Sequence, residues 1–226
     1  MSTPYLTRRS EIETYFDRTA VGAWEKLTSD APVSRIRARV RAGRDAMRTT
    51  LLSYMPADLR GVRILDAGCG TGALAVEAAM RGATVVAIDL SPQLVAVARE
   101  RLPAGLDVTF LSGDMFDPKL GQFDYVVAMD SIIHYQTRDM INIISGLSAM
   151  ATKGMIFSFP PRTIPLALLW GIGKLVPRGD KSPAIEPQPP KKLRAALAKL
   201  DGVALGRSHR VATGFYISEV QELIRT

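Results

Sequence analysis

Between residues 62 and 161, short apolar segments alternate with segments of helical periodicity. Helices are expected at 71–81, 91–102 and 138–151, and Ser91 followed by Pro92 suits the start of the second. The five expected strands are 62–68, 84–89, 107–114, 123–130 and 154–161. Because strands that are apolar along their whole length need cover on both faces, this alternation predicts a doubly wound parallel α/β sheet.

The N-terminal segment is expected to form a helical arm. One helix is predicted at 10–29 with a break near Gly22, and Ser10 and Glu13 have the spacing of a capping box at its start. A longer helix is predicted at 33–55 from its apolar periodicity. Its apolar stripe consists of Ile36, Val40, Met47, Leu51 and Leu52.

After the fifth expected strand the pattern changes. Residues 164–175 suit an apolar helix, 176–192 a proline-rich loop and 191–200 a basic helix. Two last strands, at 202–214 and 215–223, suit an antiparallel hairpin at the sheet edge and bring the mostly parallel sheet to seven strands. We therefore expect an N-terminal arm (1–60), a core (61–161), a substrate cap inserted after strand five (162–192) and a segment that completes the core (193–226).

Three glycines on alternate positions follow the first expected strand, in the stretch LDAGCGTGAL at 65–74. Glycine weakens helices and strands, so Gly68, Gly70 and Gly72 need a local reason. They lie where a strand gives way to a helix, which is where open α/β sheets bind ligands. Without a Cβ, the backbone there can approach a ligand closely.

Acidic residues stand at the ends of three successive strands. Asp66 precedes the glycines, Asp89 can accept both hydroxyls of a ribose, and Asp114 can accept the amino group of an adenine. A dinucleotide site usually lacks an acid before its glycines, because it seats a pyrophosphate. A carboxylate suits an ammonium instead, so the pattern predicts S-adenosylmethionine bound to a Rossmann-like class I methyltransferase. A sheet with tight turns and no ligand is the alternative.

The expected cofactor contacts include the neighbours of these residues at the strand ends. They are Cys69, Leu90, Met115 and Met129. Cys69 is interpreted as a small residue of the loop and not as a nucleophile, since nothing nearby in the sequence would activate it.

Amino-acid composition restricts the number of domains and the cellular compartment of this chain. A chain of 226 residues, 47% of them hydrophobic, suits one domain with a small addition. Its single cysteine excludes an internal disulfide framework and favours a reducing, cytoplasmic compartment. Residues 1–20 lack the apolar region of a secretory signal, and the longest apolar run, 164–173, is about half the length of a membrane span.

The net charge of +7 is unevenly distributed. Residues 1–60 carry 11 basic and 7 acidic side chains, residues 61–161 carry 7 and 10, and residues 162–226 carry 11 and 5. Basic flanks around a mildly acidic centre suggest contact with an anionic partner, such as nucleic acid, lipid head groups or an acidic small molecule, whereas for any single charge solubility is the better explanation.

Several stretches together resemble the magnesium protoporphyrin IX O-methyltransferases of (bacterio)chlorophyll biosynthesis. The resemblance runs over nearly the whole chain, from Tyr15 to RVATGFYIS. Its specific parts are YFD with the following Trp at 15–24, R-x-G-R at 41–44 and IHYQ at 133–136. It implies methyl transfer from S-adenosylmethionine to one propionate of Mg-protoporphyrin IX, with the magnesium carried by the substrate and no metal bound by the protein.

The resemblance also implies roles for particular residues. His134 and Tyr15 become the candidate catalytic residues, and Tyr135, Arg162 and Trp24 join them as substrate contacts. A propionate is ionised at neutral pH, so the reaction needs alignment and exclusion of water more than a base. The alternatives are a packed His134 bonded to a backbone carbonyl and a core-facing Tyr15.

The arginines of the 33–55 helix divide into two faces. Arg37, Arg41, Arg44 and Arg48 share one of them, and for most of these a solvated basic face is the expected role. Arg41 matches the family pattern and is expected to hold the carboxylate of the methionyl group of S-adenosylmethionine.

Other functions share parts of this pattern. A methyltransferase for a quinone precursor would need a general base, which His134 could supply. An RNA-modifying enzyme would suit the basic flanks, but aromatic residues do not alternate with the basic runs. A membrane-surface protein that binds S-adenosylmethionine without catalysis is a third alternative. We also expect weak peripheral membrane association through 164–178. The resemblance further implies that a magnesium chelatase subunit hands over the porphyrin. Binding to nucleic acid is not expected.

Overall fold

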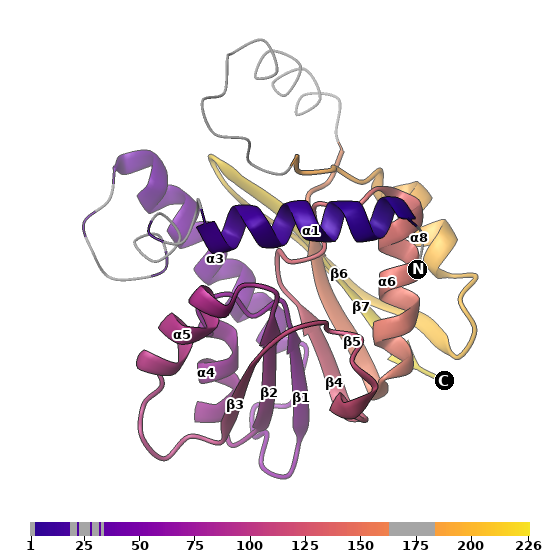
Figure 1. The fold of residues 1–226 in the computed structure, drawn as a ribbon. Helices are drawn as coiled ribbons and strands as arrows, with labels where there is room; N and C mark the ends of the chain where they lie inside the picture. The colour runs from indigo at the N-terminus through magenta and orange to yellow at the C-terminus, as the bar shows by residue number, and fades with distance from the viewer. Residues whose placement is uncertain (1–2, 19–21, 23–27, 29–31, 33, 163–183) are drawn as a thin grey trace.

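A seven-stranded sheet forms the centre of the computed structural model, which describes residues 3–18, 22, 28, 32, 34–162 and 184–226 (Figure 1). The strand order is β3-β2-β1-β4-β5-β7-β6. Strands β1 to β5 pair in parallel, while β7 runs antiparallel to both β5 and β6. The strands are β1 (Arg63–Ala67), β2 (Thr84–Asp89), β3 (Val108–Ser112), β4 (Phe123–Ala128), β5 (Ala151–Phe159), β6 (Val203–Thr213) and β7 (Tyr216–Arg225). The predicted doubly wound, mostly parallel sheet is confirmed.

Helices cover both faces of the sheet. Those of one face, α3, α4 and α5, share an apolar cluster that contains Leu51, Leu74 and Val95. Those of the other face, α1, α6 and α8, share a second cluster that contains Ile12 and Leu193. The helices are α1 (Thr3–Arg18), α3 (Arg35–Ser53), α4 (Ala73–Met80), α5 (Pro92–Glu100), α6 (Thr137–Ala149) and α8 (Pro190–Leu197), with a 3₁₀ turn at Pro118–Leu120.

Helix α5 begins as its sequence predicts. The Leu94 backbone N–H donates to Ser91 Oγ at 3.2 Å, and Pro92 occupies the first turn. A second contact comes from far away in the chain, because Asp17 Oδ1 accepts from Ser91 Oγ at 3.1 Å and from the Gln93 N–H at 3.4 Å. The N-terminus of α5 is therefore tied to the end of α1.

Helix α1 crosses above the carboxyl ends of the strands (Figure 1). Tyr5 and Ile12 bury its inner side, and Arg8 forms an ion pair with Glu186 at 3.8 Å. The predicted capping box is wrong, because the helix begins at Thr3 and Ser10 lies inside it. The helix extends further toward the N-terminus because Tyr5 is buried there, whereas the Ser10–Glu13 spacing suggests a start at Ser10.

Other boundaries differ modestly from the predicted ones. Ile36 is 54% exposed, whereas Met47, Leu51 and Leu52 of the same predicted stripe are fully buried, so only the C-terminal half of α3 packs on the sheet. Strand β5 starts three residues before the predicted one, since α6 already ends at Ala149. The predicted helix at 164–175 and the first part of the loop lie outside the described residues. In the chain as described, no helix is both long and apolar enough to cross a membrane.

Candidate active site

A cavity of about 290 Å³ opens at the carboxyl ends of β1 to β4. Residues from α1 and α3 complete its walls, so it lies between the sheet edge and the N-terminal helices. The predicted residues that line it are Arg41, Asp66, Gly68, Cys69, Gly70, Asp89, Leu90, Met115, Met129, His134 and Tyr135. This position is the one that the sequence predicts for a ligand, outside the carboxyl ends of parallel strands.

The glycine loop packs tightly against the loop that follows β4. Gly68 has a φ of +84°, and a Cβ on it would lie 2.2 Å from the Cβ of Ser131. Ser131 in turn donates its hydroxyl to the Ala67 carbonyl at 2.6 Å. Gly68 therefore meets two requirements, a left-handed backbone and a close neighbour, that only glycine satisfies.

Asp66 is almost fully buried at the end of β1. Its Oδ2 atom has no hydrogen-bond partner within the described part of the chain. Burial raises the pKa of Asp66 to about 7, and the nearby Asp89 carboxylate contributes in the same direction. A buried, unpaired carboxylate oxygen that faces a cavity calls for a cationic partner.

Asp89 stands opposite the glycine loop at the end of β2. Its carboxylate accepts from the backbone N–H of Gly70 at 2.8 Å and of Ser91 at 3.0 Å, while burial raises its pKa. A carboxylate has about four acceptor positions, and the backbone donors do not fill all of them, so hydroxyl groups of a ligand can also bind there. Burial also raises the pKa of the Cys69 thiol well above its ordinary value, which keeps the thiol protonated and unreactive.

Asp114 lies beside the cavity but is not among its lining residues. Its Oδ2 is 3.5 Å from Nη1 of Arg9 on α1, and its Oδ1 accepts from the Phe116 N–H at 3.0 Å. Its neighbours Gly113 and Met115 do line the cavity. In this arrangement the acid that is expected to meet an adenine amino group contacts an arginine of the covering helix.

Aromatic residues form the wall below α1. The His134 ring is buried, its Nδ1 is 3.3 Å from the Ala184 carbonyl oxygen, and its centroid is 5.8 Å from that of Phe16. Tyr135 stacks on Tyr5 with a centroid distance of 5.3 Å. Burial raises the pKa of Tyr5 to about 12 and that of Tyr135 further, so both hydroxyls stay protonated.

Two predicted substrate residues that the structure describes, Tyr15 and Arg162, are not brought into this wall. Tyr15 is half-buried and contacts Phe16 edge to face, 5.2 Å between centroids, but Phe16 and not Tyr15 lines the cavity. Arg162 is exposed, and its backbone N–H donates to the Gln188 carbonyl at 2.7 Å. Trp24 lies outside the described residues.

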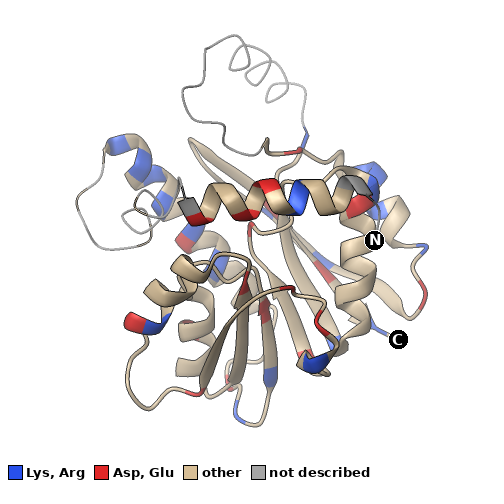
Figure 2. Cartoon of the chain, in the orientation of Figure 1, with Lys and Arg blue, Asp and Glu red and all other residues tan. Residues whose placement is uncertain are grey.

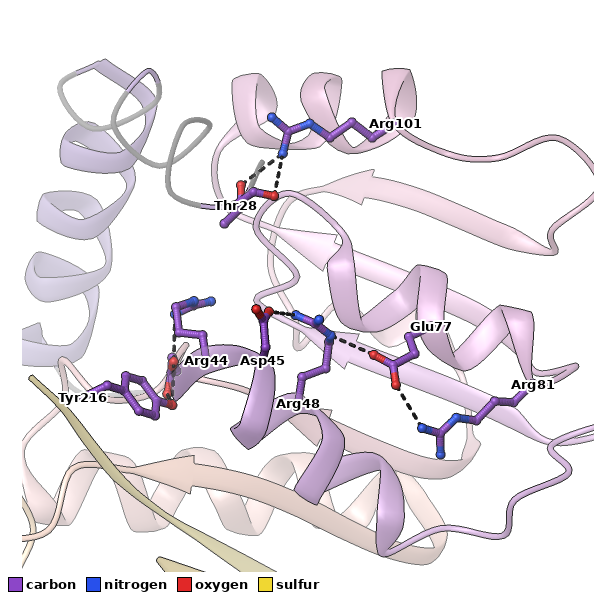
Figure 3. Close-up of polar contacts among 9 residues, drawn as sticks. Thr28, Arg44, Asp45, Arg48, Glu77, Arg81, Arg101 and Tyr216 are labelled. Atoms are coloured by element: carbon purple, nitrogen blue, oxygen red, sulfur yellow. Dashed lines mark hydrogen bonds and ion pairs between the residues drawn. The ribbon is translucent and has the colours of Figure 1, made fainter. Parts of the chain in front are cut away.

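Arginines of α3 also line the cavity. Figure 3 shows the polar contacts of two of them, Arg44 and Arg48. Arg48 lies between two carboxylates, 2.9 Å from Asp45 and 2.8 Å from Glu77, and Glu77 also pairs with Arg81 at 2.9 Å. The expected solvated basic face is therefore wrong for Arg44 and Arg48, whose side chains are only 18% and 22% exposed. It holds for the N-terminal half of α3, where Figure 2 shows basic residues gathered away from the sheet.

Asp130 and Tyr216 are two cavity-side residues that were not predicted from the sequence. Asp130 Oδ2 is 2.7 Å from Arg44 Nη1, and the Tyr216 hydroxyl is 3.1 Å from both oxygens of the same carboxylate. Burial, and then the charge of Asp130, raises the pKa of Tyr216. Asp130 is the last residue of the expected strand 123–130 and could have been noted beside Asp66 and Asp89, whereas nothing in the sequence connects it to Tyr216.

Together these groups suit a ligand with an ammonium, a diol and at least one carboxylate. Asp66 has an unpaired oxygen that could accept from a cation, Asp89 could accept from a diol, and arginines of α3 line the same cavity. S-adenosylmethionine has this set of groups, and the unpaired oxygen of Asp66 suits its ammonium.

Comparisons with known proteins agree with this arrangement. Residues 128–225 match a family model described as the C-terminus of magnesium-protoporphyrin IX methyltransferase, and residues 64–154 match a methyltransferase domain. A magnesium-protoporphyrin O-methyltransferase of Rhodobacter capsulatus is 48% identical over 98% of this chain and 99% of its own length.

Two solved structures extend the likeness to three dimensions. The crystal structure of magnesium protoporphyrin IX methyltransferase from Synechocystis PCC 6803 with bound SAH has a TM-score of 0.83, at 30% identity over 96% of this chain and 99% of that one. The same protein with bound SAM gives a TM-score of 0.79, at 26% identity over 97% of each chain.

Proposed function

The chain belongs to the magnesium-protoporphyrin O-methyltransferases, which use S-adenosylmethionine as methyl donor, and we propose that its cavity aligns this donor with one propionate of Mg-protoporphyrin IX. The observation that supports the assignment of the donor side is the buried, unpaired Asp66 Oδ2 beside the glycine loop. The product is a monomethyl ester. We also propose that the chain has the four parts expected from the sequence. They are an N-terminal arm (1–60), a core that binds S-adenosylmethionine (61–161), a substrate cap (162–192) and a segment that completes the core (193–226).

On the donor side, the chain's own groups bind and orient. Asp66 holds the ammonium, Asp89 the ribose hydroxyls, and Gly68 and Gly70 let the backbone approach. Leu90, Met115 and Met129 supply apolar contact, and Arg41 is proposed for the methionyl carboxylate. When bound, S-adenosylmethionine supplies an electrophilic methyl group attached to a sulfonium.

On the acceptor side, the protein has to align a carboxylate oxygen with the methyl group and to exclude water from that oxygen. A propionate with an ordinary pKa near 4 is already a nucleophile at neutral pH, so no residue has to remove a proton. Ile12, Phe16 and Tyr135 present apolar surface that displaces water from the carboxylate. We propose that His134 donates a hydrogen bond that orients this carboxylate, with Tyr15, Trp24 and Arg162 as outer contacts of the ring or of its second propionate.

Replacing His134 by alanine tests the orienting role. We expect kcat to fall roughly 10- to 100-fold, because loss of one orienting hydrogen bond costs alignment but no proton transfer. The dissociation constant of S-adenosylmethionine, measured by calorimetry, should stay within a factor of three. An unchanged kcat would instead support the packed histidine bonded to a carbonyl, a role that the Ala184 contact already suits.

The reaction itself is tested with purified protein, S-adenosylmethionine and Mg-protoporphyrin IX in the dark. Liquid chromatography with mass detection should show a product heavier by one methyl group, and metal-free protoporphyrin beside it shows whether magnesium is recognised. Binding of S-adenosylmethionine without any product would contradict the acceptor and leave the donor site intact. Quinone precursors would then be the next acceptors to assay.

Two wider contacts are proposed from charge and apolarity in the sequence. The basic flanks and the apolar stretch at 164–178 suit weak association with an anionic membrane surface, and the same surface suits handover of a poorly soluble porphyrin from a magnesium chelatase subunit. Flotation with anionic and neutral liposomes should show binding to the anionic ones alone. Retained binding after replacement of the apolar residues 166–170 by serine would contradict the part assigned to this stretch.

A further inference from the structure

Four side chains from four elements meet beside the cavity and are called the Asp130 cluster. They are Arg44 on α3, Asp130 after β4, Ser158 on β5 and Tyr216 on β7. Asp130 is the acceptor at the centre, with donors at 2.7 Å from Arg44, 2.8 Å from Ser158 and 3.1 Å from Tyr216. Figure 3 labels Arg44 and Tyr216 and marks their hydrogen bonds in this cluster with dashed lines.

The backbone of Asp130 is fixed in an unfavourable conformation. Its φ is +53°, and among the described residues it is the only non-glycine residue with a positive φ. The Asp130 N–H donates to Ser158 Oγ at 2.8 Å, and that hydroxyl donates back to Asp130 Oδ1. Left-handed backbone in a non-glycine residue persists where its surroundings hold it, and such residues gather at functional sites.

The cluster orients Arg44 rather than the reverse. Two hydroxyl groups and a hydrogen-bonded backbone N–H hold Asp130 in place, and its side chain is only 7% exposed. Arg44 adds its charge from the cavity side, and its own side chain lines the cavity. A guanidinium offers five N–H donors in a planar fork, so one held by an aspartate on one edge can bind a second carboxylate on another.

The two neighbouring arginines differ in surroundings. Arg48, one turn further along α3, pairs with Asp45 and Glu77, two carboxylates of the chain itself. Arg44 pairs with Asp130, which belongs to the segment after β4 that also holds His134, whereas the proposed ribose acceptor Asp89 ends β2. Arg44 is therefore directed toward the acceptor half of the cavity.

We propose that Arg44, held by the Asp130 cluster, binds the propionate of the porphyrin that is not methylated. This inference rests on the proposed function, because it needs an acceptor with two carboxylates. A carboxylate enters a cavity of low polarity only with a cationic partner, and the second propionate has to enter with the first. Arg44 then fixes the position of the ring relative to the methyl donor, and Asp130 is a positioning residue that acts through it.

The test pairs two substrates with a series of variants. The substrates are Mg-protoporphyrin IX and a magnesium porphyrin with a single propionate. The variants are Arg44→Met, which keeps the length of the side chain without its charge, Arg44→Lys, and Asp130→Asn, which tolerates the left-handed backbone. Arg37→Met is the matched control, because Arg37 is an exposed arginine on the same helix and is absent from the cavity wall.

We expect the wild type to favour the diacid by roughly 10- to 100-fold in kcat/KM, as a charge-assisted hydrogen bond allows. Arg44→Met should remove this preference by lowering kcat/KM for the diacid alone. Arg44→Lys should recover part of it, and Asp130→Asn should lie between wild type and Arg44→Met. The kcat/KM for the single-propionate porphyrin separates the two roles. Structural damage would lower it as well, whereas loss of the proposed contact would leave it unchanged.

Three results would overturn the proposal. In the first, Arg44→Met lowers kcat/KM equally for both substrates, which indicates a structural role. In the second, the dissociation constant of S-adenosylmethionine without porphyrin rises about tenfold while the preference for the diacid stays, which assigns Arg44 to the methionyl carboxylate. In the third, the wild type methylates both substrates equally well. Failure of the proposed function is distinct from all of these, because the wild type would then methylate neither porphyrin.

Discussion

Replacement of Asp66 by asparagine is expected to weaken S-adenosylmethionine binding roughly 100-fold and, at the same time, to stabilise the ligand-free protein above pH 7. The first effect follows because a buried cation loses its only proposed counter-charge, at a cost of about 3 kcal/mol. The second follows because the ligand-free fold keeps an unpaired carboxylate in a buried position. One substitution should therefore separate stability from binding.

The pH dependence has a definite sign. The pKa of Asp66 is raised to about 7 in the folded protein, above the value near 4 of an unfolded chain. Between these two values the folded state binds more protons than the unfolded state, so the free energy of unfolding falls as the pH rises from about 4 to about 7. Three pKa units set an upper limit of about 4 kcal/mol on this loss.

Urea titrations at pH 5 and pH 8 measure both parts. Wild type should lose stability between the two, while Asp66→Asn should lose less and exceed the wild type at pH 8. Affinity for S-adenosylmethionine should rise in the wild type from pH 6 to pH 8, as the carboxylate ionises, and should change little in the variant. If Asp66→Asn without ligand is less stable than wild type at pH 8, the ionised Asp66 carboxylate does not destabilise the folded protein.

Gly43→Ala is expected to destabilise the protein by about 2 kcal/mol, although alanine is the better helix former. In an exposed helix the change would add about 1 kcal/mol of stability. At this position, however, a Cβ would lie 2.3 Å from Thr213 Oγ1 and 2.6 Å from Tyr216 Cβ. Overpacking of this kind costs roughly 1–3 kcal/mol, and here the side chains that must move belong to the β6–β7 hairpin.

The same change should also reduce activity, because Tyr216 would shift away from Asp130. Urea titration and kcat/KM for Mg-protoporphyrin IX measure the two effects. Ala42→Gly is the control on the exposed side of the same helix and should cost about 1 kcal/mol through helix propensity alone, with activity unchanged. A Gly43→Ala protein as active and stable as wild type would mean that the hairpin moves aside at little cost.

Sequence patterns predict the sheet well because its signals are local. Apolar strands such as 84–89, and the Ser91 cap with Pro92 behind it, carry enough information within a few residues. The acids at the strand ends are predictable for the same reason, since parallel strands bring their carboxyl ends together. Asp66 and Asp89 were found in this way, and both line the cavity.

The residues that the sequence did not reveal depend on contacts between distant segments. The contact of Tyr216 with Asp130 spans 86 positions, and no local pattern indicates it. Gly43 was visible only as part of R-x-G-R, and its reason lies in the hairpin that packs on it. The start of α1 was missed because burial of Tyr5, and not a polar cap, decides where that helix begins.

The position of β7 has a consequence for how the protein is made. Strand β7 follows every other described element in the chain, yet it pairs between β5 and β6 and brings Tyr216 to Asp130. During synthesis on the ribosome, one edge of β5 stays without its partner until residues beyond 216 have emerged, and unpaired apolar strands promote aggregation. A nascent chain can thus form the donor side of the cavity before the Asp130 cluster is complete. Translation that stops before residue 216 should yield a protein with an open strand edge and an Asp130 cluster that lacks one of its donors.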